Sequence, residues 1–173
     1  PAPHAVNRSL APGLACGTGT HPTTAMCLRA LDAGIRPGMR VVDYGCGSGI
    51  LGVAAARLGA VAVLAVDNDP QAITASRDNA ARNQVSDTCL CTVLSGDVEI
   101  EAWAESAEWV VANILAGPLV SLASTLTALI APGGQLLLAG LLADQADEVI
   151  EAYAPAVRLK VTDQHEEWVL LAG

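Results

Sequence analysis

The sequence predicts one domain of the open α/β class, with a mostly parallel seven-stranded sheet, an antiparallel edge strand and helices on both faces. Two observations predict it. Helical and strand-like periodicities alternate along most of the chain. The strand-like runs at 61–66 and 135–139 are apolar at consecutive positions, as strands are when helices cover both sides of a sheet. A length of 173 residues leaves room for one such core.

The elements follow one another in a regular order. We expect residues 1–15, which contain three prolines and little periodicity, to be a tail or linker, and residues 16–173 to form the domain. Helices are expected at about 22–33, 49–58, 70–83, 118–130 and 143–153, and strands at 40–44, 61–66, 89–94, 109–112, 135–139, 156–162 and 166–171. The last two strands have no long helix between them, so they should pair in antiparallel fashion.

Composition and charge exclude several classes of function. No apolar stretch approaches the ~20 residues of a membrane span, and no secretory signal is visible, so we expect a cytoplasmic protein with no membrane partner. A formal net charge of −9 argues against direct binding to nucleic acid. The acidity fits a basic substrate protein and fits equally a role in solubility alone.

The five cysteines are an odd number in a core-forming chain, which favours reduced thiols over a disulfide framework. Cys89 and Cys91 alternate in a strand-like run and lack a second pair of ligands at metal-binding spacing. We therefore expect them to be buried strand residues, and we predict no metal site.

A glycine-rich turn at Gly45, Gly47 and Gly49 follows the first strand directly. In open α/β sheets this turn marks the ligand-binding edge, because glycine lets the backbone bend sharply and approach a ligand closely. The spacing is G-x-G-x-G, whereas dinucleotide-binding turns have G-x-G-x-x-G. Asp43 at the end of the strand would repel a pyrophosphate, whereas it would stabilise the cations of S-adenosylmethionine.

Three aspartates follow the next two strands. Asp67 ends the second strand about 20 residues after the turn, where an acidic side chain accepts hydrogen bonds from ribose hydroxyls. Asp69 precedes Pro70 and is interpreted as a helix N-cap. Asp97 follows the third strand, where it either approaches an adenine or belongs to an ordinary polar turn.

Two further segments complete the candidate site. Hydroxyls and free amides of the segment Gly17–Thr24 precede a helix and either bind an anion, such as a carboxylate, or cap the helix through Thr20 or a neighbour. His21 in this segment is either a general base or a residue that orients a neighbour. Asn113 ends the fourth strand, beside the glycine turn, where it either contacts the reacting group or acts as a cap.

Several linked motifs together resemble the PrmA family of bacterial methyltransferases, which modify ribosomal protein number eleven of the large subunit. The similarity runs from Pro12 to Gly173 and is carried by GTGTHPTT at 17–24, DYGCGSGIL at 43–51, AVDNDPQA at 65–72, SRDNAARN at 76–83 and VANILAGPLV at 111–120. It implies the class I S-adenosylmethionine-dependent methyltransferase fold, which is Rossmann-like.

The resemblance also implies the activity and its residues. The family's cofactor contacts correspond to Thr24, Gly45, Asp67 and Asn113, with Gly47 in the same turn. It implies S-adenosyl-L-methionine as cofactor and methylation of lysine side-chain and N-terminal amines of the ribosomal protein. Asn113, as the catalytic residue, and the backbone after it would hold the amine near the methyl group.

Two departures from the family pattern accompany this resemblance. Cys16 stands where an aromatic residue is usual, and the family's N-terminal recognition domain has no counterpart in this chain. Two rival hypotheses stay open: a nicotinamide-dependent oxidoreductase on a related fold, and a cofactor-binding fragment that is inactive without its recognition domain.

Overall fold

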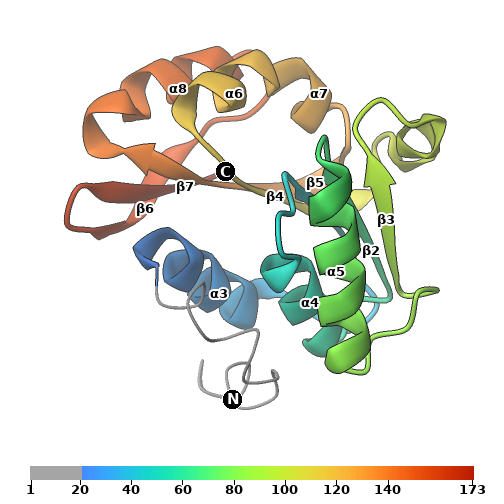
Figure 1. The fold of residues 1–173 in the computed structure, drawn as a ribbon. Coiled ribbons are helices and arrows are strands. Elements are labelled where there is room, and N and C mark those ends of the chain that lie inside the picture. The colour runs from blue at the N-terminus through green and yellow to red at the C-terminus, as the bar shows by residue number, and fades with distance from the viewer. Residues whose placement is uncertain (1–20) are drawn as a thin grey trace.

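The computed structural model describes residues 21–173, and the expectations for the tail at 1–15, for Cys16 and for Gly17–Thr20 lie outside that range. Within it, seven strands form one sheet in the order β3-β2-β1-β4-β5-β7-β6 (Figure 1). Neighbours from β3 to β5 are parallel, and β7 is antiparallel to both β5 and β6. The strands are β1 (Arg40–Tyr44), β2 (Ala62–Asp67), β3 (Leu90–Leu94), β4 (Ala107–Asn113), β5 (Ile130–Leu142), β6 (Lys160–His165) and β7 (Trp168–Ala172). The predicted sheet is confirmed.

Helices cover both faces of the sheet (Figure 1). One layer contains α3 (Pro22–Gly34), α4 (Ile50–Arg57) and α5 (Pro70–Arg82), and the other contains α6 (Ala116–Ser121), α7 (Ala123–Thr127) and α8 (Ala146–Tyr153). Two short 3-10 helices, η1 (Val98–Trp103) and η2 (Ala143–Gln145), lie in the connections. None of the helices between residues 21 and 173 is long and apolar enough to span a membrane.

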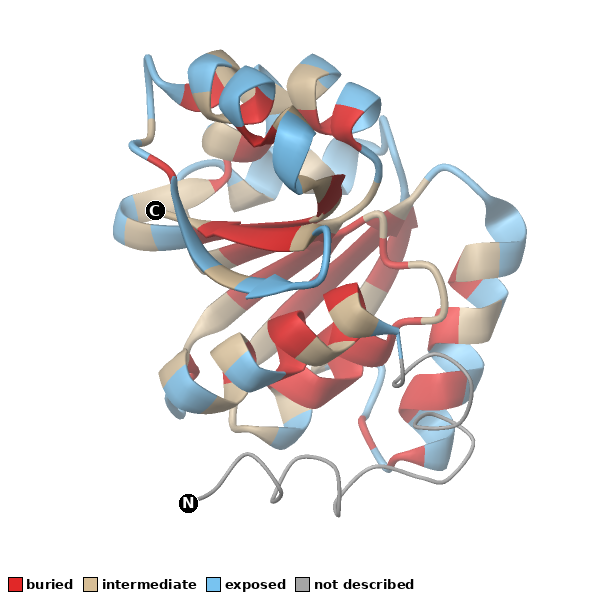
Figure 2. Cartoon of the chain, turned by 90° about the vertical axis from the view of Figure 1, so that its left-hand side faces the viewer, coloured by how far each residue is buried: buried red, intermediate tan, exposed pale blue. Residues whose placement is uncertain are grey.

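The core consists of two apolar clusters, one on each face of the sheet. Alternation along the strands divides them, since Val41 and Val63 belong to one cluster and Val42 and Leu64 to the other. Figure 2 shows the central strands as buried between the helical layers. This is why strands such as β2 are apolar at consecutive positions.

The segment predicted as one helix at 118–130 is helical, but it is divided and ends earlier. It forms two short helices, α6 and α7, which meet at Leu122. Pro118 lies in the first turn of α6 rather than at its start, a place where its missing N–H group costs no hydrogen bond. The chain then enters β5 at Ile130, because Ile130 pairs with Ala107 of β4 before the irregular Pro132–Gly134 stretch. β5 is accordingly longer at both ends than the predicted strand 135–139.

The strand predicted at 156–162 is displaced. The backbone amides of Ala156 and Val157 donate to the carbonyl oxygen of Tyr153 at 3.0 and 2.8 Å, so this segment continues the turn after α8. Strand β6 begins only at Lys160. Helix η1 was not predicted; Asp97 caps it by accepting a hydrogen bond from the amide of Glu99 at 2.9 Å.

Strand β1 lies between β2 and β4, and the chain crosses from one side of β1 to the other when it passes from β3 to β4. The carboxyl ends of β1 and β4 therefore border the crevice at which open α/β sheets bind ligands. The glycine turn follows β1 and Asn113 ends β4. The fold thus brings together the two segments that the sequence analysis placed at this edge.

Candidate cofactor site

The turn after β1 has a backbone that requires glycine. Gly45, Gly47 and Gly49 have φ angles of +79°, +53° and +84°, in the left-handed region that disfavours residues with a Cβ atom. The amides of Gly45 and Cys46 donate to the carbonyl oxygen of Val66 at 2.7 and 2.9 Å, which ties the turn to the end of β2. A Cβ atom on Gly47 would meet no atom of residues 21–173 within 4 Å, so this glycine faces open space within the described part of the chain.

Helix α5 holds the same turn from behind. The hydroxyl of Ser76, a fully buried side chain, donates to the carbonyl oxygen of Gly47 at 2.9 Å. The side-chain amide of Asn79, one turn further along α5, donates to the carbonyl oxygen of Ser48. The motif at 76–83 contains both residues, but no role was predicted for either. Their spacing could have predicted this role, because Ser76 and Asn79 are polar residues three positions apart and so share the helix face that packs toward the sheet.

Asp43 lies beneath the turn, which corrects its expected place and role. β1 continues to Tyr44, and the Asp43 side chain is buried under the start of α4. Its Oδ2 accepts a hydrogen bond from the amide of Gly52 at 3.0 Å. Burial raises the pKa of Asp43 to about 7, against the lowering effect of the Gly52 hydrogen bond, while the charge of Asp67 adds to the rise. The carboxyl group supports the turn and does not line the cavity beside it.

Asp67 ends β2 with both carboxylate oxygens held by backbone amides. Oδ2 accepts from Gly47 at 2.9 Å, and Oδ1 accepts from Asp69 at 3.0 Å. Each oxygen keeps acceptor capacity beyond these single bonds, because an ionised carboxylate has about four lone-pair sites. Asp67 is therefore a fixed acidic acceptor at the edge of the sheet.

A cavity of about 410 Å³ opens beside this acceptor. It is lined by residues at or just after the carboxyl ends of four strands, β1 to β4, and by residues of α6 and the turn after it: Tyr44, Gly45, Asp67, Asn68, Ser95, Ile114, Leu115, Pro118 and Leu122. Its volume lies in the range of small-molecule and cofactor sites. Among the described residues, its lining contains one acidic and no basic side chain. Of the predicted cofactor residues, Gly45 and Asp67 line it; Asn68 and Ser95 were missed.

Thr24 and Asn113 meet beside the end of β4. The side-chain amide of Asn113 donates to the hydroxyl of Thr24 at 3.4 Å, which joins two residues 89 positions apart in the chain. Thr24 is buried and Asn113 is half-buried. Neither side chain lines the cavity, but Ile114, the residue after Asn113, does.

His21 caps α3. Its Nδ1 accepts from the amide of Thr23 at 3.2 Å and lies 2.7 Å from the hydroxyl of the same residue. The imidazole also packs edge-on against Trp168, with 5.3 Å between ring centroids. These contacts favour an orienting role for His21 over that of a general base. They also show that His21, a neighbour of Thr20, is the residue that caps the N-terminus of α3.

The other two aspartates act as caps. Asp69 caps α5 by accepting from the amide of Gln71 at 2.9 Å, as predicted. Asp97 is exposed and caps η1, and Ser95, not Asp97, lines the cavity. Of the two roles that the sequence left open for Asp97, the structure supports the polar turn.

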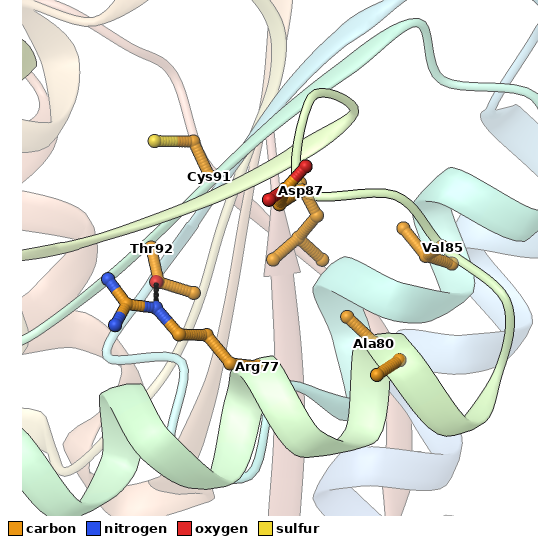
Figure 3. Close-up of a pocket in the computed structure, with 8 residues that line it drawn as sticks. Arg77, Ala80, Val85, Asp87, Cys91 and Thr92 are labelled. Atoms are coloured by element: carbon orange, nitrogen blue, oxygen red, sulfur yellow. Dashed lines mark hydrogen bonds between the residues drawn. The ribbon is translucent and has the colours of Figure 1, made fainter.

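A larger cavity, of about 540 Å³, lies away from these residues at the outer edge of the sheet (Figure 3). It is enclosed by α5, the loop after it and β3: Arg77, Ala80, Ala81, Val85, Asp87, Leu90, Cys91 and Thr92. Nε of Arg77 donates to the hydroxyl of Thr92 at 2.7 Å. Since no predicted cofactor residue borders this cavity, the smaller one is the better candidate.

The cysteines among residues 21–173 provide no alternative chemistry. Cys89 precedes β3 and Cys91 lies within it, and both are half-buried rather than buried, because β3 is an edge strand. Burial raises the pKa of Cys46 in the glycine turn to about 12, so this thiol is not a nucleophile at neutral pH. Between residues 21 and 173, no three histidine, cysteine or acidic side chains gather in a way that could hold a metal ion.

Comparison with known proteins gives a consistent result. The family described as "Ribosomal protein L11 methyltransferase (PrmA)" matches residues 1–173. Proteins of that name from Pseudomonas paraeruginosa and Ectopseudomonas mendocina are 52% and 54% identical over the whole chain, which spans 58% of the length of each. A crystal structure of ribosomal protein L11 methylase from Lactobacillus delbrueckii subsp. bulgaricus superposes with a TM-score of 0.77 at 30% identity, covering 89% of this chain and 79% of that one.

Proposed function

Because this chain belongs to the ribosomal protein L11 methyltransferase (PrmA) family, we propose that it is an S-adenosylmethionine-dependent protein N-methyltransferase. Its acceptors are lysine side-chain amines and the N-terminal amine of ribosomal protein L11. One observation carries the proposal: the glycine turn, the Asp67 carboxylate and the segment after Asn113 converge on one cavity at the carboxyl edge of the sheet.

The residues of the cavity fit S-adenosylmethionine better than they fit a dinucleotide. A pyrophosphate would meet the Asp67 carboxylate, and no arginine or lysine of residues 21–173 lines the cavity to pair with it. S-adenosylmethionine has no phosphate and carries a sulfonium and an ammonium group, so an acidic lining stabilises it. The open space in front of Gly47 lets a ligand approach the backbone there.

Each proposed site residue has a distinct task. Asp67, already fixed by two amides, accepts hydrogen bonds from the ribose hydroxyls. Thr24 and Asn113 lie near the reacting end, and the Asn113 side chain and the backbone after it hold the acceptor amine. Gly45 and Gly47 shape the turn beneath the cofactor.

Bound S-adenosylmethionine supplies an electrophilic methyl group on its sulfonium. Asn113 and the backbone after it would hold a neutral amine beside that methyl group, where transfer would form an N–C bond as the C–S bond breaks, with S-adenosylhomocysteine as the leaving group and the amine proton passing to water. A lysine amine has an ordinary pKa of about 10.4, and desolvation beside a cation favours its neutral form. The protein's task is then to position the amine and exclude water, which needs no dedicated base.

The proposed partner is consistent with the charge. An acidic chain with a net charge of −9 suits a basic protein substrate better than a direct contact with nucleic acid. Since the substrate is a ribosomal protein, we place the activity in the cytoplasm.

Calorimetry tests the cofactor. We expect the chain to bind S-adenosylhomocysteine and not NAD. NAD binding without S-adenosylhomocysteine binding would instead favour the nicotinamide-dependent oxidoreductase.

Mass spectrometry tests the acceptor. Purified ribosomal protein L11 is incubated with S-adenosylmethionine and either this chain or the full-length relative from Pseudomonas paraeruginosa. Mass gains in steps of one methyl group with both proteins support the proposal. A gain with the relative alone, while this chain binds S-adenosylhomocysteine, would identify a cofactor-binding unit that is inactive without its recognition domain.

A further inference from the structure

The main chain of Ile114 lies directly against Gly140 of β5. A Cβ atom on Gly140 would stand 2.9 Å from both the nitrogen and the carbonyl carbon of Ile114 and would overlap its carbonyl oxygen. The amide of Ile114 donates to the carbonyl oxygen of Ala139 at 3.1 Å, which holds the two segments together. Any side chain at residue 140 would therefore push the Ile114 peptide away from β5.

Gly140 also lies in a β-bulge. β5 and β7 pair through Leu138↔Leu171 and through Leu141↔Val169, so β5 has one more residue than β7 between these pairs. Gly140 has a φ of +91°, the left-handed conformation that such a bulge requires of its glycine. Bulges bend a strand locally and redirect neighbouring groups. Here the bend occurs beside Ile114, where the chain leaves β4 and passes over the cavity.

The side chain of Ile114 makes the complementary contact on the cofactor side. A Cβ atom on Gly45 would stand 2.5 Å from Cγ2 of Ile114, so this side chain rests on the first glycine of the turn. Ile114 also lines the cavity. Two glycines therefore enclose it: Gly45 limits the position of its side chain, and Gly140 limits that of its main chain.

We propose that Gly140 is a positioning residue for methyl transfer. By allowing the Ile114 peptide to lie against β5, it fixes the Ile114 carbonyl and the adjacent Asn113 side chain relative to the cofactor. This inference rests on the proposed function, in which Asn113 and the backbone after it hold the acceptor amine. Displacement of such groups by ~1 Å can cost about 100-fold in rate, because the reacting atoms lose their alignment.

Two cofactor analogues separate this role from cofactor binding. S-adenosylhomocysteine has no group at the methyl position, whereas sinefungin carries an amine there and so reports on the groups that hold the acceptor. Calorimetry on the full chain measures both affinities. Gly140→Ala should weaken sinefungin binding by about tenfold or more relative to S-adenosylhomocysteine binding.

Gly133→Ala is the matched control. Gly133 lies in the same strand with a φ of +78°, but a Cβ atom there would meet no atom within 4 Å in the part of the chain that the structure describes. It therefore introduces comparable backbone strain without the overlap, and we expect the ratio of the two affinities to match that of the wild type. An equal loss of both ligands in Gly140→Ala, or no loss of either, would overturn the proposal.

If Gly140→Ala does not fold, a second variant tests whether the contacts of Ile114 position the groups that hold the acceptor. Ile114→Ala removes the side chain that rests on Gly45 and creates no overlap, and it should also weaken sinefungin more than S-adenosylhomocysteine. An unchanged ratio in that variant would refute the role of this contact. If the wild-type chain bound neither analogue, the proposed function itself would fail. If the wild-type chain bound both analogues and the variants kept its ratio of sinefungin affinity to S-adenosylhomocysteine affinity, only the inference about Gly140 would fail.

Discussion

Replacing Asp43 by asparagine should remove a pH dependence that this buried carboxyl group imposes on stability. Asp43 is 1% exposed, and burial raises its pKa from 3.8 to about 7. The unfolded chain, with the lower pKa, releases the proton first as pH rises. The stabilising contribution is therefore fully present below about pH 4 and is lost as pH rises through about 7. Asparagine keeps an oxygen that can accept from Gly52, but it does not ionise.

The size of the pKa shift of Asp43 determines how much the free energy of unfolding changes with pH. About 3 pH units at about 1.4 kcal/mol per unit correspond to roughly 4 kcal/mol over the full range. Between about pH 5 and about pH 8.5, linkage with these two pKa values gives a loss of roughly 3 kcal/mol for the wild type relative to Asp43→Asn. The variant should therefore gain in relative stability with rising pH.

Urea unfolding at a series of pH values measures this difference. Asp78→Asn is the control, because Asp78 is an exposed acid on α5 and its substitution changes the formal charge equally. The free-energy difference between wild type and Asp43→Asn should change with pH, whereas that for Asp78→Asn should change by far less. Parallel pH profiles for wild type and Asp43→Asn would refute the reasoning.

Three further substitutions test other parts of the structure. Asp67→Asn should weaken S-adenosylhomocysteine binding by about 1.5–3 kcal/mol in calorimetry, through loss of charge-assisted hydrogen bonds; unchanged affinity would remove Asp67 from the site. Ser76→Ala should weaken the same binding by about 1 kcal/mol, because one turn carbonyl loses its donor. Thr74→Ala, on the exposed side of the same helix, should not, and equal effects would contradict a specific role. Tyr153→Phe leaves the buried carbonyl of Leu119 without its 2.6 Å donor and should lower the free energy of unfolding by about 1–3 kcal/mol in urea titrations; an unchanged midpoint would show that water replaces the donor.

The sequence predicted most of the sheet because its strands carry strong local signals. Consecutive apolar residues in β2 and the glycines after β1 need no tertiary information to be recognised. The same rules place Asn113 at the carboxyl edge, because it ends β4 beside the turn after β1. Thr24 lies in α3, ahead of β1, and only the family resemblance had placed it in the same site. The predictions were reliable where local pattern and topology pointed to the same place.

Features that depend on long-range contacts escaped prediction. The start of β5 at Ile130 follows from pairing with β4 and contradicts the local helical pattern. The tasks of Ser76 and Asn79 depend on carbonyl groups about 30 residues earlier in the chain. Gly140 follows the predicted strand 135–139 and had no predicted role, because its position depends on the bulge and on the Ile114 peptide beside it. Such partners are set by packing, which a single sequence does not specify.

The crossing from β3 to β4 links cofactor binding to completion of folding. β1 pairs with β4 through Val41↔Trp109, contacts that are distant in sequence and carry a high loop-closure entropy. A partly folded chain with only β1, β2 and β3 in place would have the glycine turn but lack the wall formed by Ile114 and Leu115. A ligand stabilises only the states that bind it. S-adenosylmethionine should therefore favour the complete sheet over its partly assembled forms, and so protect the second half of the chain from local unfolding.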